Sequence, residues 1–134
     1  MPTKHWIFTV SPIRHIKDGL HANQVSKAIL LQAVDQLGKS YFPSYEIMMD
    51  ELRDYRFYAE DMVHPSNVAV DYIWQRFLET YMTLETQNEM RTMNQLWRDR
   101  HHRFLHPNSE EAKRFEQRTA ERIQDLQRLY PWLE

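Results

Sequence analysis

The sequence predicts an α/β fold dominated by helices, with two parallel strands, four or five helices and a helical hairpin at the C-terminal end. Three observations predict it: a short β-prone run opens the chain, a helix-periodic stretch separates it from a second such run, and long amphipathic stretches follow. Two strands joined by a helix form a parallel βαβ unit. Because so few strands do not make a stable sheet by themselves, we expect this unit to be the end of a larger doubly wound fold.

The first strand is expected at residues 6–10, Trp-Ile-Phe-Thr-Val, which are β-prone without interruption. Such a run is typical of a strand buried on both faces. Asn23 is a favourable N-cap for the next helix, and Gly38 supplies the left-handed residue that ends it. The second strand is expected at residues 45–49, Tyr-Glu-Ile-Met-Met, after a turn-prone Phe-Pro-Ser.

The remaining elements are predicted to be helices whose starts carry capping signals. Ser66 is a favourable N-cap for a helix with one apolar stripe. Two later pairs have capping-box spacing and predict two further helices that form an antiparallel hairpin. These pairs are Thr86 with Glu89 and Asn108 with Glu111. We therefore expect residues 1–84 to belong to an α/β domain and residues 85–134 to form a helical hairpin packed on it.

Composition excludes several classes of function. The 17 basic and 19 acidic residues give a net charge of -2, which predicts no nucleic-acid partner. The absence of cysteine excludes a disulfide, a thiolate nucleophile and a thiolate metal site. No segment approaches the roughly 20 apolar residues that span a bilayer, and the first five residues do not resemble a signal peptide. These observations favour a cytoplasmic protein without a membrane partner.

An Asp-x-x-His pattern occurs three times, at Asp18 to His21, Asp61 to His64 and Asp99 to His102. Accidental spacing among seven histidines is the simplest explanation of each occurrence taken alone. Context separates them: the first flanks a loop glycine, and the third lies in a charged helical run that is most simply a solvated face.

Only the second occurrence directly precedes a predicted helix start. Pro65 biases His64 away from the α region and so keeps it on a loop. Asp61 can accept the Nδ1 proton of His64, which leaves Nε2 free as a general base toward a hydroxyl nucleophile. We therefore take Asp61 and His64 as candidate catalytic residues.

A second polar cluster follows the first predicted strand and consists of Ser11, Arg14, His15 and Asp18. Its first three members are candidate substrate-binding residues. Sites in open α/β sheets form at the carboxyl ends of the strands, where this loop is expected. The alternative is equally open: a simple turn with an exposed arginine. His102 and His106 have the spacing of a metal-binding pair, but no third ligand is near, so no metal and no cofactor is expected.

Two ordered motifs are Phe-Thr-Val-Ser-Pro-Ile-Arg-His at residues 8–15 and Asp-Met-Val-His-Pro-Ser at residues 61–66. They resemble the C-terminal half of the bacterial GSCFA family, which belongs to the SGNH/GDSL-type hydrolases. Further similar stretches are residues 23–28, 41–47 and 50–58, and the Phe-Leu-His-Pro of the helical tail.

The resemblance implies a three-layer α/β/α fold that hydrolyses an ester or acyl group through an acyl-serine intermediate. It places Asp61 and His64 at the acid and base positions of the triad. The family's serine lies in a Gly-Ser-Cys-Phe-Ala segment that this sequence does not contain. We therefore expect a C-terminal fragment that is inactive alone, whose longer parent binds a small ester or acylated substrate. The alternative is a non-catalytic helical interaction module that forms a homo-oligomer through an exposed sheet edge.

Overall fold

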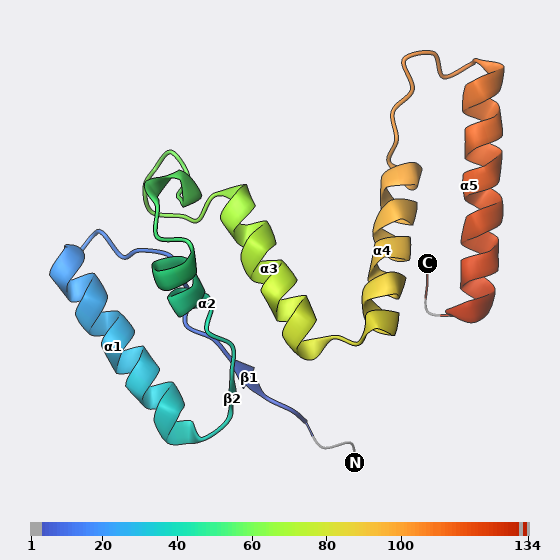
Figure 1. Ribbon diagram of the computed structural model, residues 1–134. Helices are drawn as coiled ribbons and strands as arrows, with labels where there is room; N and C mark the ends of the chain where they lie inside the picture. The colour runs from blue at the N-terminus through green and yellow to red at the C-terminus, as the bar shows by residue number, and fades with distance from the viewer. Residues whose placement is uncertain (1–3, 132, 134) are drawn as a thin grey trace. The chain divides into compact units, whose positions relative to one another are not determined.

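The computed structural model describes residues 4–131 and 133, and the chain divides into two compact units, Met1–Tyr81 and Met82–Glu134 (Figure 1). The chain is helix-dominated with a two-stranded parallel sheet, which confirms the predicted fold class. The three-layer parent fold, and the packing of the hairpin on an α/β domain, stay predictions. Among the described residues, no helix combines the length and the apolar character that crossing a bilayer requires.

The first unit is a βαβ unit followed by short helical turns and one long helix. Strand β1 pairs with β2 in parallel, in the register Ile7 with Ser40 and Phe8 with Tyr41 (Figure 1). The elements in chain order are β1 (Ile7–Phe8), α1 (Leu20–Leu37), β2 (Ser40–Tyr41), α2 (Ser44–Glu46), the π-helical turn η1 (Ile47–Glu51), the 3₁₀ turn η2 (Tyr55–Phe57) and α3 (Asn67–Tyr81).

The second predicted strand, residues 45–49, is wrong: this stretch is helical, and the paired strand lies just before it at Ser40–Tyr41. The Ile47 N–H donates to the Pro43 carbonyl at 2.9 Å, and the Leu52 N–H donates to the Ile47 carbonyl at 3.0 Å. A short apolar run is compatible with either a strand or a buried helix, and here packing against α3 selects the helix.

The expectation that the first strand is buried on both faces is also wrong. Trp6 is 63% exposed and Ile7 is 42% exposed, whereas Val10, beyond the paired residues, is buried. In the part of the chain that the structure describes, the sheet has two strands, so β1 has a neighbour only on its β2 side. An uncovered strand therefore presents apolar side chains to the outside.

In the first unit, two of the three predicted capping residues have the expected role. Gly38 ends α1 in the left-handed conformation, with φ 57°, and the Ala69 N–H donates to the Ser66 Oγ at 3.3 Å at the start of α3. Asn23 is not a cap, because α1 begins at Leu20 after Gly19. Asn23 lies inside the helix and is buried. Its side chain is then available to bind another segment of the chain.

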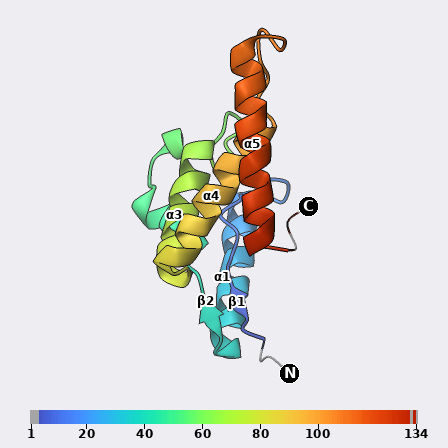
Figure 2. The ribbon, with the colours of Figure 1, turned by 90° about the vertical axis from the view of Figure 1, so that its right-hand side faces the viewer.

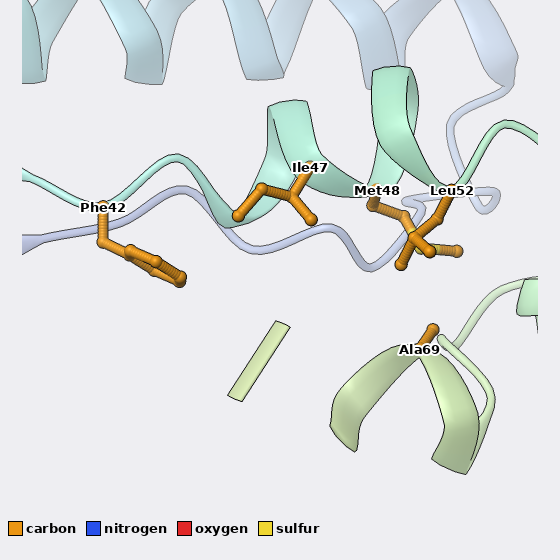
Figure 3. Packing of buried hydrophobic residues seen from close by; sticks show 5 residues of the cluster. All are labelled: Phe42, Ile47, Met48, Leu52 and Ala69. Carbon is orange, nitrogen blue, oxygen red and sulfur yellow. The ribbon is translucent and has the colours of Figure 1, made fainter. Parts of the chain in front are cut away.

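The core of the first unit joins the short helical turns to α3. Figure 3 shows Ala69 of α3 across from the side chains of Met48 and Leu52, and all three residues are buried. The Phe42 ring meets the Phe77 ring edge to face, with centroids 5.1 Å apart. This packing anchors η1 and the start of α3, and thereby both flanks of the connection at residues 58–66.

The second unit is an antiparallel pair of helices, α4 (Leu84–Arg100) and α5 (Glu110–Leu129), which lie side by side in both views (Figure 1 and Figure 2). The Tyr130 hydroxyl donates to Glu89 Oε1 at 2.7 Å, near the start of α4. At the other end of α4, the Arg122 guanidinium lies 3.3 Å from the Asp99 carboxylate. These contacts between the two helices confirm the predicted hairpin.

The two helices of the hairpin begin at caps other than those predicted. The Thr86 N–H donates to the Thr83 Oγ1 at 3.2 Å, so α4 begins earlier than a cap at Thr86 requires. The Ala112 N–H donates to the Ser109 Oγ at 3.2 Å, which makes Ser109 the cap of α5 in place of Asn108. Several neighbouring residues here have favourable capping chemistry, so the sequence pattern locates the start only to within a few residues.

Candidate functional site

The candidate site is built on the connection between η2 and α3. Tyr58 and Pro65 form an isolated antiparallel bridge, and the Ala59 N–H donates to the His64 carbonyl at 2.8 Å. The bridge closes residues 59–64 into a tight loop whose two ends are anchored by the core. Asp61 and His64 therefore sit on a short, restrained turn.

Within this turn, Asp61 Oδ2 lies 2.6 Å from His64 Nδ1, inside the hydrogen-bond distance that the Asp-x-x-His spacing predicts. Asp61 Oδ1 accepts the backbone N–H of Val63 at 2.9 Å and that of His64 at 3.0 Å. The backbone N–H groups of His64 and Val63, and then the imidazole, lower the pKa of Asp61 to about 2.

An ionised carboxylate only accepts hydrogen bonds, so the short contact requires the proton of the neutral imidazole to be on Nδ1. His64 Nε2 is then an acceptor. Both side chains are about half exposed, which leaves the imidazole accessible. The pair can therefore act chemically as a general base with an orienting carboxylate.

Met62 gives the turn its shape. Of the non-glycine residues that the structure describes, it alone has a positive φ, at 58°. The left-handed conformation costs an ordinary residue about 1–2 kcal/mol. Local hydrogen bonds support this conformation: the Met62 N–H donates to the Ala59 carbonyl at 2.9 Å, and Asp61 accepts the two backbone N–H groups that follow Met62.

The structure brings the second predicted cluster to the same loop through Arg14. The Arg14 N–H donates to the Val63 carbonyl at 3.2 Å, and Arg14 Nη1 donates to the Met62 carbonyl at 3.3 Å. The guanidinium carbon lies 3.9 Å from the centre of the Tyr58 ring. Arg14 thus contacts the backbone of the candidate catalytic turn directly.

Ser11 and His64 both line one apolar groove of about 620 Å³ in the first unit. Helix α3 also lines this groove, with Val70, Ile73 and Trp74. Ser44 also lines the groove, but its Oγ donates to the Val10 carbonyl at 2.8 Å. The groove therefore places the imidazole beside an apolar surface.

Like Arg14 and Asp61, the predicted site residue His15 does not line this groove. Its side chain is exposed, and its backbone N–H donates to the Asn23 Oδ1 at 2.8 Å. Lys27 Nζ donates to the Ser11 carbonyl at 2.5 Å, and burial lowers the pKa of this lysine. Both α1 side chains are buried and hold the loop that carries Ser11, Arg14 and His15.

Sequence reasoning missed the roles of Asn23 and Lys27. Their spacing of four residues puts them on the same face of α1. This pair of polar residues on one face of a helix that is otherwise rich in apolar residues could have indicated that the face binds polar groups of another segment.

The third Asp-x-x-His lacks the geometry of the second. The Asp99 carboxylate contacts Arg122 and accepts a hydrogen bond from Gln95 Nε2 at 2.7 Å. The His102 ring packs against the Phe104 and Phe115 rings, with centroids 4.7 Å and 5.4 Å away. Within the described part of the chain, no group of three or more histidine, cysteine, aspartate or glutamate residues is placed to hold a metal ion. The expectation of a site without metal or cofactor stays a prediction.

Comparison with known proteins gives one match: the model of the GSCFA family is similar to this chain over residues 1–77. The match covers the βαβ unit, the Asp61–His64 turn and most of α3. No curated protein and no solved structure matches the chain.

Proposed function

Because this chain belongs to the GSCFA family, matching its model over residues 1–77, we propose that it carries the base and the orienting carboxylate of an SGNH-type serine hydrolase. His64 is the base and Asp61 orients it. The observation that carries the proposal is the 2.6 Å contact between Asp61 Oδ2 and His64 Nδ1, on an accessible turn beside a groove. The reaction class is hydrolysis of an ester or acyl group.

In the proposed reaction, His64 Nε2 removes the proton of a serine hydroxyl while the hydroxyl oxygen attacks the substrate carbonyl. The imidazolium that forms is stabilised by Asp61 and then protonates the leaving oxygen, so that an acyl-serine remains. His64 next removes a proton from water, which attacks the acyl-serine. Release of the acid returns the proton to the serine and regenerates the site.

We assign the nucleophile to none of the serines of this chain. Ser44 donates its hydroxyl proton to a backbone carbonyl, and Ser11 Oγ accepts the Ile13 N–H at 3.3 Å in a simple turn. The expected source is the Gly-Ser-Cys-Phe-Ala segment of a longer parent. The 134-residue chain by itself is then inactive as a serine hydrolase.

The groove supports a substrate with an apolar acyl group. Its wall on α3 presents Val70, Ile73 and Trp74 next to His64, so an acyl chain laid in it removes apolar surface from water. A small ester or an acylated molecule is therefore the proposed substrate class.

A serine-directed fluorophosphonate probe tests the proposal. We expect no labelling of the 134-residue chain, and labelling of a longer protein in which this sequence follows a Gly-Ser-Cys-Phe-Ala segment. Replacement His64→Ala in the longer protein is expected to abolish labelling. Stoichiometric labelling of the short chain that disappears in His64→Ala would show that the chain has its own nucleophile.

The second candidate function is self-association, and the exposed apolar strand favours it. Trp6 and Ile7 are exposed, and β1 has a neighbour on one side only in the described chain. The unpaired backbone groups of such an edge can form hydrogen bonds with a strand of a second copy. Sedimentation velocity at high micromolar concentration should detect a dimer that Ile7→Lys weakens, whereas a monodisperse monomer would count against this candidate.

A further inference from the structure

Three residues bind the polar backbone groups at the centre of the Asp61–His64 turn: Ala59, whose carbonyl accepts the Met62 N–H at 2.9 Å, Asp61 and Arg14. Asp61 accepts the N–H groups of Val63 and His64. The carbonyls of Met62 and Val63 are instead bound by Arg14, through its guanidinium and its backbone N–H respectively. Met62 is left-handed, and the donor that its carbonyl binds comes from a distant part of the chain, the Arg14 guanidinium at 3.3 Å.

The Arg14 guanidinium is itself restrained before it reaches the turn. Its carbon lies over the Tyr58 ring, 3.9 Å from the ring centre, and over the Tyr55 ring, 5.7 Å from the ring centre. Tyr58 also forms the bridge that closes the loop. A planar guanidinium can stack and donate at once, which an ammonium group does less well.

The segment that carries Arg14 is fixed on both sides by buried polar side chains of α1. Lys27 Nζ donates to the Ser11 carbonyl before Arg14, and Asn23 Oδ1 accepts the His15 N–H after it. The backbone on both sides of Arg14 is therefore held by α1. From this position the guanidinium donates to the carbonyl of Met62, 48 residues later in the sequence.

We propose that Arg14 is a positioning residue: its guanidinium holds the Met62 carbonyl and thereby keeps Asp61 and His64 in the geometry of a base and its orienting carboxylate. This differs from the sequence-based expectation that Arg14 contacts the substrate. This role rests on the proposed hydrolase function, because the geometry it maintains is that of a catalytic pair. The geometry itself can be tested without measuring enzymatic activity.

The test uses NMR on the 134-residue chain and its variants. Two quantities are measured: the titration midpoint of the Asp61 carboxyl carbon and the hydrogen exchange of the Val63 and His64 amides. Arg14→Met removes the guanidinium but retains the backbone N–H that binds the Val63 carbonyl. Arg14→Lys restores a charged donor, and Arg56→Met is the matched control, since Arg56 stacks on Phe57 at 4.8 Å and pairs with Asp54 without touching the turn.

In Arg14→Met, we expect the Asp61 midpoint to rise from about 2 toward its ordinary 3.8, because the amides that stabilise the carboxylate are no longer held in place. Exchange of the two amides should accelerate by about tenfold or more, the effect of losing one hydrogen bond to a charged group. Arg14→Lys should recover part of both changes, and Arg56→Met should leave both as in the unaltered chain. The Ala69 methyl resonance, a reporter of the buried core, should stay in place in all variants.

An Arg14→Met chain with an intact core, an unchanged Asp61 midpoint and unchanged amide exchange would overturn the positioning role. Changes of equal size in Arg56→Met would overturn it as well, because they would reflect general loosening. Neither result contradicts the proposed hydrolase function, because that function is tested separately, by probe labelling of the longer protein and of its His64→Ala variant. Conversely, failure of that labelling leaves the NMR result unaffected.

Discussion

Asp61 contacts His64 twice, through Oδ2 to the ring Nδ1 at 2.6 Å and through Oδ1 to the backbone N–H at 3.0 Å. One carboxylate therefore restrains both the side chain and the backbone of the same histidine. The direct contact on the imidazole that orients it thus comes from a carboxylate of its own turn, three positions earlier in the sequence.

The low pKa of Asp61 predicts how this turn responds to acid. The folded-state pKa of about 2 lies below the ordinary value of 3.8, so the folded protein binds fewer protons than the unfolded chain between these values. The ionised carboxylate therefore stabilises the fold above about pH 4, and this contribution is lost as the pH falls toward 2. Carboxyl-carbon NMR should show the midpoint near 2, and a midpoint near 3.8 would contradict the contact geometry.

Asp61→Asn should impair the longer, Gly-Ser-Cys-Phe-Ala-containing protein without unfolding it. An amide can present its N–H to Nδ1 and favour the wrong tautomer, which costs roughly 10⁴-fold in rate in a serine triad. Turnover of a short aryl ester provides the measurement. Asp99→Asn, in the Asp-x-x-His whose carboxylate binds Arg122, is the matched control and should change the rate little.

Met48→Ala should destabilise the first unit by about 2–5 kcal/mol, the usual range for removing a buried methionine side chain. Met48 is 1% exposed and lies across from Ala69 in the core (Figure 3). Urea denaturation followed by circular dichroism measures the change. Leu105→Ala, at a residue that is 95% exposed, should alter the free energy of unfolding by no more than about 0.5 kcal/mol.

Replacement of the two neighbouring candidates for the α5 cap distinguishes the observed start from the predicted one. Ser109→Ala should cost about 1 kcal/mol, because the Ala112 N–H loses its acceptor at the helix start. Asn108→Ala should have a smaller effect, since Asn108 lies outside the cap position. Thermal unfolding of the two variants side by side makes the comparison, and a larger loss for Asn108→Ala would place the helix start one residue earlier.

Features that depend on neighbours within a few residues could be predicted from the sequence. The contact between Asp61 and His64 spans three positions, and Pro65 keeps the histidine on a loop, so spacing and local preference were sufficient. The left-handed stop at Gly38 and the cap at Ser66 were predictable for the same reason. Each is a short-range interaction whose partners are brought together by the chain itself.

Features that depend on distant partners could not be predicted in this way and become visible in the folded chain. Residues 45–49 fit a strand or a helix equally well in sequence, and burial of Ile47 and Met48 in the cluster with Ala69 selects the helix. The hydrogen bond from Arg14 to Met62 joins residues that are 48 positions apart in the sequence. Asn23 binds the backbone of His15 in place of capping a helix, and this depends on where the loop at His15 lies. Such contacts follow from which surfaces the folded chain brings together, and no local pattern of residue types contains that information.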